Sequence, residues 1–586
     1  MAGVALLVNA PAASAHAQLE SSDPAAGAVV PVAPRQVTLV FGEAVEPSAK
    51  SIEVFDDHFR RVPTGQIAAT GSGGGGLSAS LPAGLANGTY TVTWQVSSSD
   101  THPVSGSFRF SVGVPSTVTG GLPAPPHNDL AGLLLGGMRG VGYVGLALGP
   151  GLLLVVLALW PEGLADRPTR RLLWVGLGVL VASTMGAQLL QAVWVGGQPL
   201  SAIWSSPGSL STHSRRLDQL MAVRYFLVFA FVFGLMVAVM LRPASPSPAA
   251  GGPGAAASHG ALAPEKVVLP SWVLGLAAFT TAALIATFAF AGHASAGSAA
   301  PLAISANILH LMAVSTWLGG LALIAVSLRP ASRADDLAAV LPRFSRLAFA
   351  CVAVIVLSGA FLALREVGSV AALLSTEYGR LLLVKVTGVV ALVAVGNLAR
   401  RWVQRHLPSP PRRPFLPPGT AGIVPVREMT FEPVEYGRPE LARLHRGVFA
   451  ELGIAVLVLA LSSALVVVLP ARQDYVPPFH KTVTTADMRV DLDVASPRVG
   501  DTVLRVRVHT PDGRPVAVTA MRGSITLSSA NLGPLALQPV SKGGASSAGA
   551  TDMKVTLPAR GVWTVRLTVQ TSPVDATALS AQLPVS

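Results

Sequence analysis

The sequence has a single cysteine, Cys351, within an apolar segment. One thiol excludes a disulfide within the chain, CxxC redox chemistry and thiolate metal clusters, so a metal site would be built mainly from other groups. Charged residues are also scarce, at 12%, against about 25% in soluble globular proteins. With 51% hydrophobic residues in a 586-residue chain, this composition indicates a membrane protein with several domains, some of them soluble.

A nucleotide-binding loop is missing as well. Neither GxxxxGKS nor GxxxxGKT occurs, which argues against an ATP-driven pump. Lys+Arg (42) exceed Asp+Glu (30), and the net charge is +12. Most of the excess lies in loops between apolar segments, where a membrane topology explains it better than nucleic acid. We therefore predict no nucleic-acid partner.

Eight mostly apolar runs of roughly twenty residues predict eight helices that cross a lipid bilayer. They occupy 130–470 and are centred near Leu146, Val181, Phe231, Phe279, Val314, Ile355, Val390 and Leu457. If the chain's first domain is outside, the inward loops carry eighteen Lys and Arg residues and the outward loops four. This positive-inside bias predicts a multi-pass protein of the plasma (inner) membrane with both terminal domains extracytoplasmic.

The two ends of the chain alternate apolar and polar residues, as β-strands do. Residues 16–115 predict a small antiparallel β-sandwich or barrel, and 116–129 a linker. Residues 475–586 predict an immunoglobulin-like β-sandwich. The fold class is therefore mixed, with an eight-helix transmembrane bundle between two β domains.

The first fifteen residues, 1–15, are typical of the end of a secretory signal peptide. A short apolar run precedes "ASA", which fits a small-x-small cleavage site, although the basic n-region is missing. Either the true start lies upstream or the signal is unusual. Cleavage before His16 would give this histidine a free amine beside its imidazole.

Asp100 and His102, in "SSSDTHPVSGSFRF", are two residues apart and would share one face of an extended strand. On its own this pair is weak evidence, because an aspartate that begins a turn and a surface histidine look the same. With a terminal His16, however, the nitrogen and oxygen ligands suit tetragonal Cu(II). We therefore predict a copper site formed by His16, Asp100 and His102.

Two histidines lie in the apolar runs. His293 ends the fourth run, and His310 is in the first half of the fifth, so both are predicted near the outward mouth of the bundle. Polar groups inside a bilayer are costly and are functional candidates. The two imidazoles predict a membrane copper path, and the alternative is a hydrogen bond between packed helices.

The first domain resembles the periplasmic copper-binding family CopC in "HAQLESSDPAAGAVV", "VTLVFGEAVEP" and "YTVTWQVSSSDTHPVSGSFRFSV". The resemblance implies a small β-barrel or sandwich that binds Cu(II) through the residues at positions 16, 100 and 102. Many members of the family also bind Cu(I) in a methionine-rich segment. The domain has no methionine after Met1, so that second site is expected to be absent.

The membrane part resembles the copper-resistance family CopD in "GHASAG", "LHLMAVSTWLGGL", "EYGRLLLVKVTGVV" and "RGVFAELGIAVLVLALSSALV". The resemblance implies eight spans and copper uptake. Lys385 and Glu451 match positions typical of the family, inside apolar segments. An intramembrane ion pair between them is one interpretation, with either a structural or a gating role. The last domain resembles YtkA-like modules in "DLDVASPRVGDTVLRVRVHTPDGRPV".

Three functions compete at this point. The first is a transporter that captures Cu(II) outside and moves copper inward, contributing to copper homeostasis and resistance. The second is an extracytoplasmic copper chaperone or assembly factor that delivers copper to other copper-handling proteins. The third is a redox enzyme with a histidine brace, but Asp100 would then occupy the coordination plane that an oxygen substrate needs. We expect a transporter and no enzyme.

Overall fold

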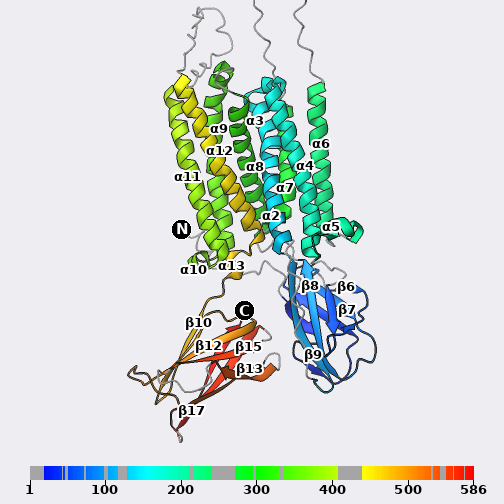
Figure 1. Ribbon diagram of the computed structural model, residues 1–586, viewed down its shortest axis with the longest axis vertical. Coiled ribbons are helices and arrows are strands. Elements are labelled where there is room, and N and C mark those ends of the chain that lie inside the picture. The colour runs from blue at the N-terminus through cyan, green and yellow to red at the C-terminus, as the bar shows by residue number, and fades with distance from the viewer. Residues whose placement is uncertain are drawn as a thin grey trace, which may run out of the picture. The chain divides into compact units, whose positions relative to one another are not determined.

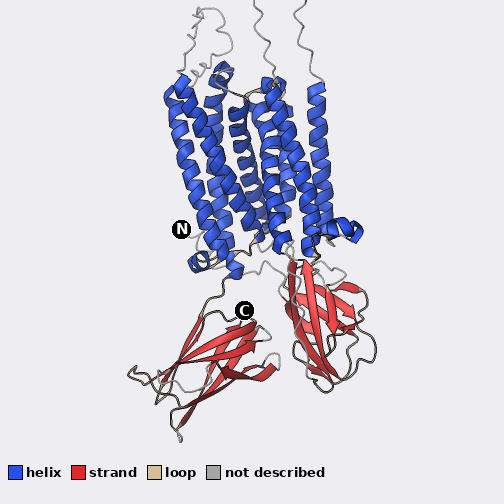
Figure 2. Ribbon diagram, in the orientation of Figure 1, coloured by secondary structure: helices blue, strands red, loops and turns tan. Residues whose placement is uncertain are grey.

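The computed structural model describes residues 19–42, 44–45, 51–70, 74–97, 103–116, 129–196, 198–209, 215–240, 271–292, 294, 299–328, 334–406, 438–528, 532–540, 550–557, 560–572 and 575–585. Strands form both terminal parts, and helices form the segment between them (Figure 2). This arrangement confirms the mixed fold class.

The N-terminal part is a sandwich of two sheets with the strand orders β1-β3-β7-β6 and β2-β9-β8-β4-β5. The pairing is antiparallel, except that β2 runs parallel to β9. Alternating side chains such as Leu39, Ile52 and Val92 are fully buried between the sheets, because successive residues of a strand point to opposite faces. The strands are β1 (Leu19–Asp23), β2 (Val29–Val30), β3 (Gln36–Phe41), β4 (Ile52–Phe55), β5 (Arg61–Val62), β6 (Ile67–Thr70), β7 (Gly76–Ser80), β8 (Gly88–Ser97) and β9 (Pro103–Val112).

The middle part is a helical bundle (Figure 1), and its described residues include eight spans that are long and apolar enough to cross a membrane. Each predicted centre lies within one of the eight. The helices are α2 (Asp129–Leu146), α3 (Leu152–Leu159), α4 (Arg167–Val195), α6 (Arg215–Met240), α7 (Ser271–Phe290), α8 (Ala300–Val326), α9 (Ala334–Val367), α11 (Glu377–His406) and α12 (Arg438–Val467), with the short α5 (Ala202–Ser205), α10 (Val370–Ser375) and α13 (Ala471–Asp474).

The first span is interrupted. Between α2 and α3 the backbone forms a π-helical segment, Ala147–Gly151, that contains Pro150. This segment packs directly on α8. A Cβ on Gly319 of α8 would lie 2.7 Å from the carbonyl oxygen of Ala147 and from the carbonyl carbon of Gly151. The first and fifth spans are also the most buried of the eight, so α8 is a central helix of the bundle.

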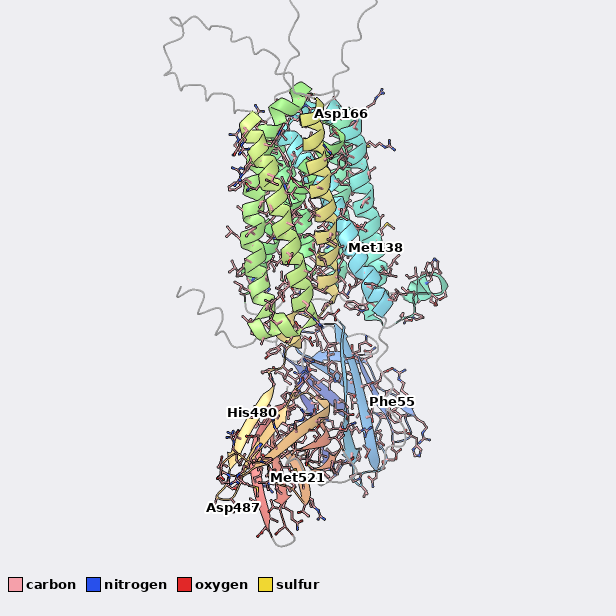
Figure 3. The ribbon with its side chains drawn as sticks, turned by 60° about the vertical axis from the view of Figure 1, so that its left-hand side comes forward. Phe55, Met138, Asp166, His480, Asp487 and Met521 are labelled. Carbon is pink, nitrogen blue, oxygen red and sulfur yellow. The ribbon has the colours of Figure 1, made fainter. Side chains whose placement is uncertain are left out.

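Specific contacts define the two ends of the bundle. Asp166 is the N-cap of α4, and its carboxylate accepts the backbone N–H of Thr169 at 3.1 Å, which satisfies one unpaired donor of the first turn. Figure 3 labels Asp166 at one end of the bundle. At the other end, a Cβ on Gly132 of α2 would lie 3.4 Å from Val467 of α12. The first span thus begins where the last one ends, as an even number of spans requires, and we call this the terminal end of the bundle.

The C-terminal part is antiparallel throughout, in the order β10-β11-β12-β15-β14-β13-β16-β17. Because β14 pairs with β13 along most of its length and with β15 at its end, it joins the two halves into a nearly closed barrel or sandwich. Trp563 is fully buried in its core. The strands are β10 (Phe479–Thr484), β11 (Arg489–Val494), β12 (Gly500–His509), β13 (Ala520–Leu527), β14 (Leu532–Pro539), β15 (Ala550–Leu557), β16 (Gly561–Gln570) and β17 (Ala576–Val585).

Candidate metal sites

The three predicted Cu(II) ligands, His16, Asp100 and His102, lie outside the described residues. The strands that flank them are described. Position 16 is three residues ahead of β1, and positions 100 and 102 belong to the segment that joins β8 to β9. The ligand set stays a prediction, but the strands fix the end of the domain from which each segment departs.

Both segments depart from the same end of the sandwich. Leu19, the first residue of β1, pairs with Phe41 at the end of β3. The ring of Phe41 packs edge-on against Trp94, with 5.1 Å between the ring centroids. Trp94 is three residues before Ser97, where β8 ends. The described ends of β1 and β8 therefore lie at one end of the sandwich.

A different group of metal-ligating atoms occurs in the turn between β4 and β5. Asp56, Asp57 and His58 place one ligand atom each within 4.8 Å of the others. However, one oxygen of Asp56 accepts the backbone N–H groups of His58 and Arg60, and the other accepts Arg60 Nε at 2.8 Å. Burial opposes these bonds, but they outweigh it and lower the pKa of Asp56. The group therefore serves to build the turn, and the side chain of His58 is exposed.

In the bundle, His310 of α8 lies in the half nearest the terminal end, and His293 lies outside the described residues. His310 Nδ1 is 3.0 Å from Ser358 Oγ of α9. Two helices thus bring an imidazole and a hydroxyl together, so the alternative of a hydrogen bond between packed helices also describes part of what His310 does.

Lys385 and Glu451 do not meet. The Glu451 carboxylate is buried beside Gly396 of α11, where a Cβ would lie 3.9 Å from Oε1. Lys385 is eleven residues earlier on the same helix, or about 16 Å along its axis at 1.5 Å per residue. The intramembrane ion pair suggested from the sequence is therefore not formed, because the two helices run antiparallel with Lys385 and Glu451 in different halves.

Sequence reasoning missed a buried arginine. Arg224 of α6 donates from Nε and Nη2 to the hydroxyl and the carbonyl of Thr287, each at 2.9 Å. Its guanidinium lies 3.7 Å from the centroid of the Phe288 ring. Arg139 of α2 also turns into the bundle, because it donates to Gln191 of α4 at 3.1 Å. An arginine inside an apolar run was the available signal for Arg224.

The histidines of the C-terminal domain also have partners that the sequence did not reveal. His480 Nδ1 is 2.5 Å from Asp493 across β10 and β11, and His480 is labelled on its strand in Figure 3. Arg507 donates to the second oxygen of Asp493 at 2.5 Å. His509 and Asp491 approach to 3.5 Å. These contacts join neighbouring strands of the sheet, and Arg507 occupies a carboxylate oxygen of Asp493 that a metal would need.

Two protein families match parts of this chain. Residues 19–113 match the CopC domain family, and residues 338–465 match the family Copper resistance protein D. Copper transport protein CutJ of Bacillus subtilis is 25% identical over 513 residues, which cover 86% of this chain and 83% of CutJ. Protein YobA of Escherichia coli is 35% identical over 102 residues, 17% of this chain and 82% of YobA. The chain belongs to the CopC and CopD families of copper-resistance proteins.

The CopC part has further relatives. Copper resistance protein C of Xanthomonas campestris is 35% identical over 114 residues, 19% of this chain and 89% of that protein. Among solved structures, CopC from Methylosinus trichosporium OB3b is 33% identical and aligns over its full length with 18% of this chain, at a TM-score of 0.16. The names of these families and relatives indicate copper resistance and transport rather than catalysis.

The CopD match spans α9 to α12 and includes Ser358, Lys385 and Glu451. His310 lies ahead of this match, on α8. The YtkA-like resemblance of the last domain stays a prediction.

Proposed function

We propose that this protein captures Cu(II) outside the cell through its CopC domain and moves copper inward across the plasma membrane through its helical bundle. The observation that carries the proposal is the union of a CopC domain and CopD helices in one chain that is similar to a copper transport protein over most of its length. Copper is the cargo, and its passage contributes to copper homeostasis.

In this proposal, His16, Asp100 and His102 hold Cu(II). The terminal amine and the imidazoles supply nitrogen ligands and the aspartate an oxygen ligand, a set that suits Cu(II). The common end from which β1 departs and to which the β8–β9 connection belongs supports this assignment. Delivery to the bundle follows from the predicted orientation, in which eighteen of the loop Lys and Arg residues face the cytoplasm.

Within the bundle, His310 is the proposed copper ligand, with His293 nearer the outward mouth. Polar side chains are costly in a bilayer, and the imidazole of His310 is held by a hydrogen bond between two helices. Neutral imidazole is a suitable ligand for copper in either common oxidation state.

Copper accumulation in cells tests the proposal. Cells that express the wild-type protein should accumulate more copper than cells without it, and His310→Ala should abolish the gain. Leu309→Ala is the matched control, because Leu309 is exposed on the outside of the same helix turn. If His310→Ala accumulates as much copper as Leu309→Ala, the proposed path is wrong. If the wild type delivers copper to an extracytoplasmic enzyme without accumulation, the protein is a chaperone.

A further inference from the structure

One edge of the His310 imidazole lies directly against α9. Nδ1 is 3.0 Å from Ser358 Oγ, and the next residue of α9 is Gly359. A Cβ at Gly359 would lie 3.3 Å from His310 Cε1 and 3.7 Å from Nδ1. The glycine leaves room for the ring, and the serine meets its Nδ1 atom. The geometry thus specifies which nitrogen faces α9.

The single proton of the Ser358 hydroxyl decides the direction of this hydrogen bond. Ser358 Oγ is 2.5 Å from the carbonyl oxygen of Val354, one turn earlier on α9. A carbonyl can only accept, so the hydroxyl donates to Val354. Toward His310, the same oxygen can then act only as an acceptor. Nδ1 of the imidazole must therefore carry a proton and donate it.

We propose that Ser358 is a positioning residue that holds neutral His310 as the Nδ1–H tautomer and so presents Nε2 as the copper ligand. A neutral imidazole with a proton on Nδ1 has its lone pair on Nε2. Histidine ligands commonly donate their other ring nitrogen in this way, which fixes both the tautomer and the ring orientation. The inference rests on the proposed function, because it assumes that copper passes His310.

The tautomer can be measured without copper. Full-length protein labelled with 13C and 15N in histidine is reconstituted in lipid and studied by solid-state NMR, which distinguishes Nδ1–H from Nε2–H imidazole. The His310 signals are those lost in His310→Gln. We expect the Nδ1–H tautomer in the wild type and in Ser358→Thr, which keeps the hydroxyl, and a loss of this preference in Ser358→Ala. An Nε2–H tautomer in the wild type overturns the inference.

Copper transport supplies the second readout. Removing a partner that orients a metal ligand typically weakens metal affinity by about 10- to 100-fold, so Ser358→Ala should raise the KM for copper by that factor, and Ser358→Thr should restore it. A uniform loss in both variants would indicate only a packing role and overturns the inference.

The two proposals fail in different ways. If His310→Gln transports copper as the wild type does, the route through His310 fails. If His310→Gln is inactive but Ser358→Ala keeps the wild-type KM, only the positioning role of Ser358 is overturned.

Discussion

Replacing Gly319 by alanine tests whether the contact between α8 and the π-helical segment holds the bundle together. The added Cβ would lie 2.7 Å from Ala147 O and Gly151 C, whereas carbon atoms are at their best separation at about 3.5–4.0 Å. The nearest neighbours are backbone atoms, so no side chain can rotate away. The two spans must separate by about 1 Å to accept the methyl group.

The cost follows from these contacts. Overpacking a well-packed interior costs about 1–3 kcal/mol. We expect a cost of about 3 kcal/mol here, because the backbone of the π-helical segment opposite Gly319 is rigid. Alanine gains about 1 kcal/mol over glycine from helix propensity. We therefore expect Gly319→Ala to lose about 2 kcal/mol of unfolding free energy, the difference between these two effects.

Gly178→Ala is the control for this substitution. Gly178 lies on α4 with no atom within 4 Å of its Cβ position, so only the favourable propensity term applies there. Unfolding of both variants in detergent is followed by tryptophan fluorescence. Equal stability of Gly319→Ala and Gly178→Ala would refute the account of a close backbone contact between α8 and the first span.

Three further predictions concern the other parts of the chain. Adding one residue before a mature His16 should severely weaken the affinity for Cu(II), which a competition titration measures. An unchanged affinity would show that the terminal amine is not a ligand. Lys385→Met and Glu451→Gln should change unfolding free energy additively, within about 0.5 kcal/mol, because they are far apart; larger coupling in the double variant contradicts the separation. In β11, burial alone would raise the pKa of the Asp493 carboxyl. The hydrogen bonds from the His480 and Arg507 side chains outweigh burial and lower this pKa below 3.8. Its folded pKa is below the unfolded one, so its stabilisation is present above pH 3.8 and is lost as the pH falls further. The difference between Asp493→Asn and wild type in hydrogen exchange of β11 should therefore be present at pH 7 and should shrink as the pH falls below 3.8.

The parts of the fold that follow from a local sequence pattern were predictable. Hydropathy alone located all eight spans, because a bilayer imposes a length of about twenty apolar residues on each helix. Period-two alternation, as in β8 and β12, predicts the two β domains, but it does not mark shorter strands such as β6 and β7. The π-helical segment, in which Pro150 lies between two glycines, was not predicted.

The contacts between distant residues were less predictable. The charge of Lys385 and Glu451 suggested a pair, but helix register decides which residues meet, and it depends on packing at glycines such as Gly388 and Gly396. The same limit hid the His480–Asp493 pair, which strand register creates across thirteen residues. Ser358 had no signal in the sequence, because a serine in an apolar helix usually bonds its own backbone.

Copper flux into sealed vesicles of known orientation tests the central claim most directly. Purified protein is reconstituted with its terminal domains on a known side, and labelled copper is added to that side or to the opposite one. The account predicts accumulation when copper is added on the side of the CopC domain, and its loss in His310→Gln. Equal accumulation in vesicles that contain wild-type protein and in vesicles without protein would contradict it.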